Sequence, residues 1–138
     1  MSGADLAKAA ASLIGTRWRL HGRDPATWLD CIGLLAAALA GIGRQAILPT
    51  GYPLRLRTVA TWLPDPTALG FAATDQPIEP GDVILNQPGP AQIHLAIAAP
   101  REGWIHANAG LRQVVQQSEL PPGAVLGRWR LTSSQKGK

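Results

Sequence analysis

Cys31 is the only cysteine of the chain, and Asp30 stands directly before it. The apolar run that begins at Cys31 predicts a buried helix ending at the glycines 41 and 43. With Asp30 as the N-cap, the thiol lies in the first turn, where free backbone N–H groups and the helix dipole favour a thiolate. We therefore expect a lowered thiol pKa and a cysteine nucleophile, provided that the Asp30 carboxylate is occupied by the cap or by a cation.

Two of the three histidines lie in predicted strands, His94 in 93–98 and His106 in 104–108. A hairpin turn of three or five residues between these strands, within 99–103, puts both rings on one face of the sheet. His94 is then expected to take the thiol proton, while His106 holds its ring in one tautomer. Asn108 shares that face and is an alternative orienting residue.

The elements that must position these side chains come in a helix-then-strand order. A first helix is expected over 5–14, with Leu6, Ala10, Leu13 and Ile14 on its buried stripe, followed by a loop over 16–29 that contains His21. Strands are expected at 82–86, 93–98, 104–108, 113–116 and 125–131. Without βαβ alternation, this order predicts an α+β domain with an antiparallel sheet.

The length of 138 residues fits a single domain, placed at 1–131 and followed by a disordered basic tail at 132–138. The apolar run after Asp30 is short of the roughly 20 residues that cross a bilayer, so no membrane span is expected. The N-terminus does not resemble a signal peptide. The net charge of +4 is spread thinly, so no specific nucleic-acid site is expected.

Five motifs resemble one family in their order and spacing: Ile-Gly-Thr-Arg-Trp-Arg-Leu-His-Gly, Leu-Asp-Cys-Ile-Gly-Leu-Leu, Ile-Glu-Pro-Gly-Asp-Val-Ile-Leu, Ile-His-Leu-Ala-Ile-Ala and Trp-Ile-His-Ala. Over residues 14–108 they are similar to the NlpC family of papain-like bacterial cysteine peptidases. The resemblance implies a papain-like α+β fold with the nucleophile helix packed on an antiparallel sheet. It also implies a Cys31–His94–His106 triad without a cofactor. The implied substrate is a peptidoglycan stem peptide, commonly cut at the γ-D-glutamyl–diaminopimelate bond.

The chain departs from the family pattern at two positions near the nucleophile. Trp18 replaces a tyrosine whose hydroxyl assists the oxyanion site, and Ile32 replaces a serine. Asp30 matches a position that helps to bind the free amine of the substrate. Together with His21 and Asn108, Asp30 and Trp18 are the residues that we expect to line the substrate cleft.

The Asp-Cys-Ile-Gly-Leu motif, with no signal peptide or wall-binding repeat, resembles the branch found in phage tails and gene transfer agents. The implied route is synthesis in the cytoplasm and action at the cell wall as part of a virion-like tail, with tail proteins as partners. The proline-rich stretch 44–80, which includes Tyr52, Trp62 and Phe71, is then either a docking surface or a cover for the core.

Three other functions fit the same residues. Cys31, His94 and His106 also form a Cys-His-His zinc set, although their spacing is not that of a structural zinc motif. The domain can instead be a structural tail component with a degenerate, inactive site, as the changes at Trp18 and Ile32 suggest. A third alternative is another cysteine acyl-transfer reaction, by an amidase or a transferase.

Overall fold

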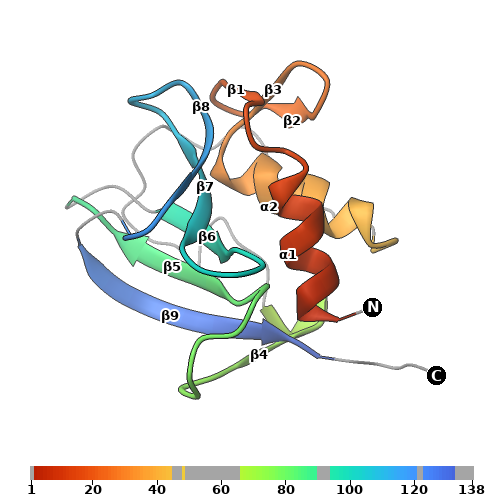
Figure 1. Ribbon diagram of the computed structural model, residues 1–138, viewed down its shortest axis with the longest axis vertical. Helices are drawn as coiled ribbons and strands as arrows, with labels where there is room; N and C mark the ends of the chain where they lie inside the picture. The colour runs from red at the N-terminus through yellow and green to blue at the C-terminus, as the bar shows by residue number, and fades with distance from the viewer. Residues whose placement is uncertain (1, 45–47, 49–65, 90–93, 121–122, 133–138) are drawn as a thin grey trace.

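The computed structural model describes residues 2–44, 48, 66–89, 94–120 and 123–132. Within them, two α-helices pack against a nine-stranded sheet with the strand order β2-β3-β1-β8-β7-β6-β5-β9-β4 (Figure 1). All neighbouring strands are antiparallel except β1 and β3. The predicted α+β class is therefore confirmed.

The longer elements follow the predicted helix-then-strand order, and three two-residue strands lie between the two α-helices. The helices are α1 (Gly3–Ala11), α2 (Cys31–Gly41) and the 3₁₀ helix η2 (Pro66–Leu69). The short strands are β1 (Arg17–Trp18), β2 (Arg23–Asp24), β3 (Trp28–Leu29) and β4 (Phe71–Ala73). The longer strands are β5 (Val83–Gln87), β6 (His94–Ala98), β7 (Trp104–Asn108), β8 (Gln113–Gln117) and β9 (Ala124–Leu131).

Helix α2 begins where the sequence predicted, because Asp30 caps it. The Asp30 side chain accepts a hydrogen bond of 2.8 Å from the Gly33 backbone N–H. The preceding loop packs so closely on this first turn that a Cβ on Gly33 would lie 1.9 Å from the Gly22 carbonyl oxygen. Glycine is therefore required at position 33, and the loop and the helix start hold each other in place.

The first helix is shorter than predicted at its C-terminal end. It spans Gly3–Ala11 with Ser12 as its C-cap, and Leu6 and Ala10 are buried as expected. Ile14 lies beyond the helix and is 43% exposed, so its place on the buried stripe was wrong. The stripe ends because the helical period ends with the cap, after which the Gly15 N–H bonds the Val114 carbonyl of β8.

The segment 16–29 was predicted to be a loop. The structure instead has three two-residue strands there, β1, β2 and β3. Arg17 pairs with Gln113 of β8, and β3 pairs with both β1 and β2. Strands of two residues are too short to show a two-residue hydrophobic period in the sequence, and β1 joins the rest of the sheet through β8, far along the chain.

The β6–β7 hairpin has the predicted odd loop of five residues, 99–103, because Ala98 pairs with Trp104. Gly103 adopts φ +87°, and a Cβ there would lie 2.7 Å from the Gln117 carbonyl oxygen, so the turn requires glycine. One face of the hairpin, with Leu95, Ile97 and Ile105, joins the main core with the helices. The other face carries a second cluster of Ile84, Ala96, Ala98 and Trp104.

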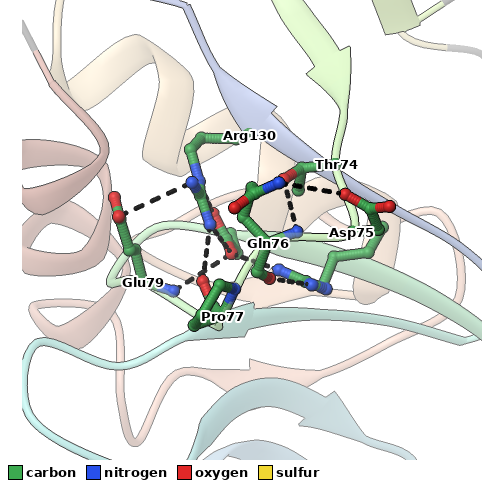
Figure 2. Close-up of polar contacts among 8 residues, drawn as sticks. Thr74, Asp75, Gln76, Pro77, Glu79 and Arg130 are labelled. Atoms are coloured by element: carbon green, nitrogen blue, oxygen red, sulfur yellow. Dashed lines mark hydrogen bonds and ion pairs between the residues drawn. The ribbon is translucent and has the colours of Figure 1, made fainter.

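An ion network around the buried Asp82 joins the segment before β5 to β9, and Figure 2 shows the contacts of Arg130 with Pro77 and Glu79. The Asp82 carboxylate, with no exposed surface, binds Arg128 Nη1 at 2.7 Å and Arg130 Nε at 2.8 Å. Arg130 also donates to the Pro77 carbonyl at 2.8 Å and lies 3.6 Å from the Glu79 carboxylate. These two arginines therefore hold the segment before β5 against β9.

The structure bears on two expectations about the outer segments. For Phe71, the alternative of a cover for the core is the one that fits, because Phe71 lies in β4, is 4% exposed and pairs with Leu131. Tyr52 and Trp62 lie outside the described residues. Thr132, assigned to a disordered tail, bonds the Gly70 carbonyl through its N–H and its hydroxyl, each at 2.8 Å. Residues 133–138 lie outside the described part, within which no helix has the length and apolarity needed to cross a bilayer.

Candidate active site

Cys31 is the first residue of α2 and is half-buried at the junction of this helix with β6. Its sulfur accepts hydrogen bonds from the backbone N–H groups of Ile32 and Leu95. Leu95 directly follows His94, so the thiol is held one residue away from the predicted base.

A break in the β6–β7 ladder makes room for this sulfur. Along β6 the Ala98 N–H points to the β5 side and the Ala99 N–H bonds Gly103 on the β7 side, so alternation directs the Leu95 N–H toward β7. In the described part of the sheet, however, the β6–β7 pairing consists of Ile97–Ile105 and Ala98–Trp104. The Cys31 sulfur therefore takes an amide that a continued ladder would have used.

His94 and His106 are in direct contact, which confirms the predicted same-face arrangement. His94 Nε2 lies 2.8 Å from His106 Nδ1, and the two rings meet edge to face with centroids 4.8 Å apart. His106 has no exposed surface, whereas His94 is half-buried. The contact uses the Nε2 atom of His94 and leaves its Nδ1 atom for another partner.

The sequence analysis missed Gln117, whose Oε1 atom lies 2.6 Å from His106 Nε2. In the β7–β8 register His106 pairs with Val115, so Gln117, opposite Trp104, is the diagonal neighbour of His106 on the same face. Extending the alternation of the predicted strand 113–116 by one residue would have placed Gln117 on the histidine face. His94, His106 and Gln117 thus form one polar row across β6, β7 and β8.

The electrostatics of the site differ from the prediction of a lowered thiol pKa. Burial, followed by the negative charge of Asp30, raises the pKa of Cys31 to about 12, although the Leu95 and Ile32 amides and Arg23 oppose the rise. Burial and the neighbouring His106 lower the pKa of His94 to about 4. Near pH 7 the resting site therefore holds a neutral thiol and a neutral imidazole, because desolvation outweighs the helix N-terminus.

This charge state predicts slow thiol alkylation. At pH 7 we expect iodoacetamide to modify Cys31 more than about tenfold slower than a cysteine in an unstructured peptide, because only the thiolate reacts. The rate should rise steadily up to and beyond pH 9. Alkylation followed by mass spectrometry measures both rates, and a Cys31 that reacts faster than the peptide at pH 7 would contradict the raised pKa.

Asp30 organises the loop around the nucleophile. Its buried carboxylate accepts from the His21 N–H at 2.8 Å and pairs with Arg23 Nη1 at 3.0 Å, in addition to capping α2. His21 itself has a left-handed backbone with φ 66°. The Asp30 carboxylate is therefore occupied both by the helix cap and by a cation, as a cysteine nucleophile beside it was expected to require. The contact of Asp30 with a substrate amine stays a prediction.

The remaining site residues have structural contacts of their own. Trp18 is partly buried against the main core, and Ile32 is a core residue only 1% exposed, so the change from serine at position 32 fills the core. Asn108 Oδ1 accepts from the Leu111 N–H at 2.9 Å and caps the β7–β8 turn. His94 thus contacts His106, while the Asn108 oxygen is used in the turn, and the place of Asn108 in the substrate cleft stays a prediction.

The zinc alternative gains no support from the geometry. In the described part of the chain, no three side chains of the His, Cys, Asp or Glu types are arranged to hold a metal ion. Two of the four nitrogens of the histidine pair already face each other.

No protein-family model matches the sequence, and no curated protein is similar to it. Several solved structures are similar to this chain in their fold. NlpC1 from Trichomonas vaginalis matches with a TM-score of 0.68 and 21% identity, over 92% of this chain and 44% of that one. The NlpC/p60 domain of the peptidoglycan hydrolase SagA matches with a TM-score of 0.57 and 26% identity, over 86% of this chain and 90% of that one.

The peptidoglycan hydrolase RipB from Mycobacterium tuberculosis matches with a TM-score of 0.62 and 18% identity, over 96% of this chain and 65% of that one. The chain spans less than half the length of NlpC1 and of a second Trichomonas vaginalis structure, NlpC2. These likenesses establish that the chain has the papain-like α+β fold of NlpC/p60 domains, as the motifs predicted.

Proposed function

From the NlpC/p60 fold of this chain, we propose that the protein is a cysteine peptidase that hydrolyses amide bonds in peptidoglycan stem peptides. The observation that carries the proposal is the histidine pair, 2.8 Å apart, next to the amide that holds the Cys31 sulfur. A thiol at a helix start beside a base and its orienting residue is the arrangement that acyl transfer requires. SagA and RipB, which share the fold, are both described as peptidoglycan hydrolases.

In the first half of the proposed reaction, His94 Nδ1 takes the Cys31 proton as the sulfur attacks the scissile carbonyl carbon. The two atoms must close to hydrogen-bond distance when substrate binds. Backbone N–H groups at the start of α2 stabilise the oxyanion. The C–N bond then breaks, and protonated His94 delivers its proton to the leaving amine.

In the second half, a water molecule replaces the amine. His94 Nδ1 takes a proton from this water, the hydroxide attacks the thioester carbonyl, and the proton returns to the Cys31 sulfur as it leaves. The acid product and the resting thiol are restored together. Because the pKa of His94 is lowered to about 4, its imidazole is neutral at pH 7 and the lone pair of the proposed base is not already protonated.

We propose the γ-D-glutamyl–diaminopimelate bond as the bond that is cut, because the motif resemblance points to it. Digestion of purified sacculi with the wild type and with Cys31→Ala tests the activity and the bond together. Mass spectrometry of the soluble products should show fragments with a new diaminopimelate amino terminus for the wild type and none for Cys31→Ala. Intact sacculi after treatment with a folded wild-type protein would overturn the proposal.

We also propose that the peptidase reaches the wall as part of a phage or gene-transfer-agent tail. The support is the Asp-Cys-Ile-Gly-Leu motif around the nucleophile, which resembles that branch of the family. Tethering at a tail tip would give the enzyme a high local concentration at its substrate. Proteomics of purified native particles is the test, and a protein found only outside particles would remove the tail role while leaving the peptidase intact.

A further inference from the structure

We propose that Gln117 is a positioning residue that sets the tautomers of both histidines and so keeps His94 Nδ1 unprotonated for the thiol. The inference rests on the proposed function, since it concerns the base of that reaction. Gln117 would then be a fourth residue of the proposed site, after Cys31, His94 and His106.

Both ring nitrogens of His106 are in use. Nε2 faces Gln117 Oε1 at 2.6 Å, and Nδ1 faces His94 Nε2 at 2.8 Å. A neutral imidazole has one N–H donor and one acceptor nitrogen, and a glutamine side-chain oxygen only accepts. His106 must therefore carry its proton on Nε2 and present Nδ1 as an acceptor.

The same rule then applies to His94. Because His106 Nδ1 accepts, His94 Nε2 must donate, and a neutral His94 has its proton there. Its Nδ1 atom is left with a free lone pair, which is what a general base needs. The orientation of one amide on β8 thus decides the proton position on β6, two strands away.

These proton positions on His94 and His106 require a neutral His106, and the surroundings of His106 favour the neutral ring. Burial lowers the pKa of His106, while the hydrogen bond to Gln117 partly opposes this effect. A charged His106 would donate from both nitrogens, so His94 would have to accept through Nε2 and protonate Nδ1. A glutamine therefore suits this position better than a carboxylate, which would favour the charged ring.

The chain supplies a matched control in the adjacent residue. Gln116 lies on the same strand but on the opposite face, and its Nε2 atom donates to the Glu102 carbonyl at 2.9 Å. Gln116→Leu removes the same amide as Gln117→Leu without touching the histidines. Gln117→Glu keeps an acceptor at the site.

The test is long-range ¹H–¹⁵N NMR of ¹⁵N-histidine-labelled full-length protein at pH 7, which distinguishes protonated from unprotonated ring nitrogens. The wild type and Gln116→Leu should both show His94 protonated on Nε2. Gln117→Leu should show mixed tautomers for both rings and a kcat about 10- to 100-fold lower, with KM unchanged. In Gln117→Glu the acid limb of the pH profile should move to higher pH.

A wild type with His94 protonated on Nδ1, or a Gln117→Leu variant with the wild-type tautomers, would overturn the inference. The NMR readout needs no turnover, so it separates this inference from the proposed function. Sacculi that stay intact although the tautomers are as expected would refute the peptidase alone. Thermal unfolding of Gln117→Leu beside Gln116→Leu shows whether a changed spectrum comes from a folded protein.

Discussion

Replacing His94 with alanine is expected to lower kcat for wall-peptide hydrolysis by at least about a thousandfold. The resting thiol is neutral, since burial raises the pKa of Cys31 to about 12, so attack depends on a base that removes its proton. The other imidazole of the pair, His106, has no exposed surface and its Nε2 atom faces Gln117, so we do not expect it to replace His94 as the base. KM should change little, because the lost interaction acts on the transition state.

Initial rates on a soluble muropeptide measure this effect, with His21→Asn as the control. His21 is the third histidine of the chain and lies in the loop before α2, where asparagine tolerates its left-handed backbone. Because His21 is expected to line the cleft, the control can change KM, but it should retain most of the wild-type kcat. If His94→Ala and His21→Asn lose activity equally, His94 is not the base.

Replacing Asp82 with asparagine is expected to lower the free energy of unfolding by about 3 kcal/mol. The carboxylate is fully buried between Arg128 and Arg130, so the substitution removes the charge that both guanidinium groups share and leaves Arg130 with the more exposed Glu79, at 3.6 Å. Asp75→Asn is the control, because Asp75 lies on the same segment but is exposed (Figure 2). It should change stability by less than about 0.5 kcal/mol.

Urea unfolding at several pH values measures both variants. Burial by itself raises the pKa of Asp82, but Arg130, the Glu79 amide and Arg128 together bring it below the ordinary value of 3.8. A folded-state pKa below the unfolded value contributes stability above pH 4 that is lost as the pH falls through the folded pKa. The difference in the free energy of unfolding between wild type and Asp82→Asn should therefore become smaller in acid. A difference that becomes larger there would contradict the role of the network.

Much of the site follows from local sequence. The Asp30 cap places Cys31 at the helix start, because capping depends only on the residues of the first turn. The five-residue hairpin loop places His94 and His106 on one face, because strand alternation and turn length settle the register between neighbouring strands.

Other features depended on contacts between distant segments. Strand β1 pairs with β8, almost a hundred residues along the chain, and β3 pairs in turn with β1. Gln117 meets His106 only through the β7–β8 register. No pattern in the sequence predicts that Arg128 and Arg130 form ion pairs with Asp82.

The charge state of the nucleophile shows the difference most directly. The sequence by itself determined that Cys31 opens a helix, and from the helix N-terminus it predicted a lowered thiol pKa. Only the tertiary structure decided that the sulfur is packed against β6, where desolvation has the larger effect and raises the pKa. Desolvation depends on every atom packed around the sulfur, and those atoms come from segments whose positions no local pattern specifies.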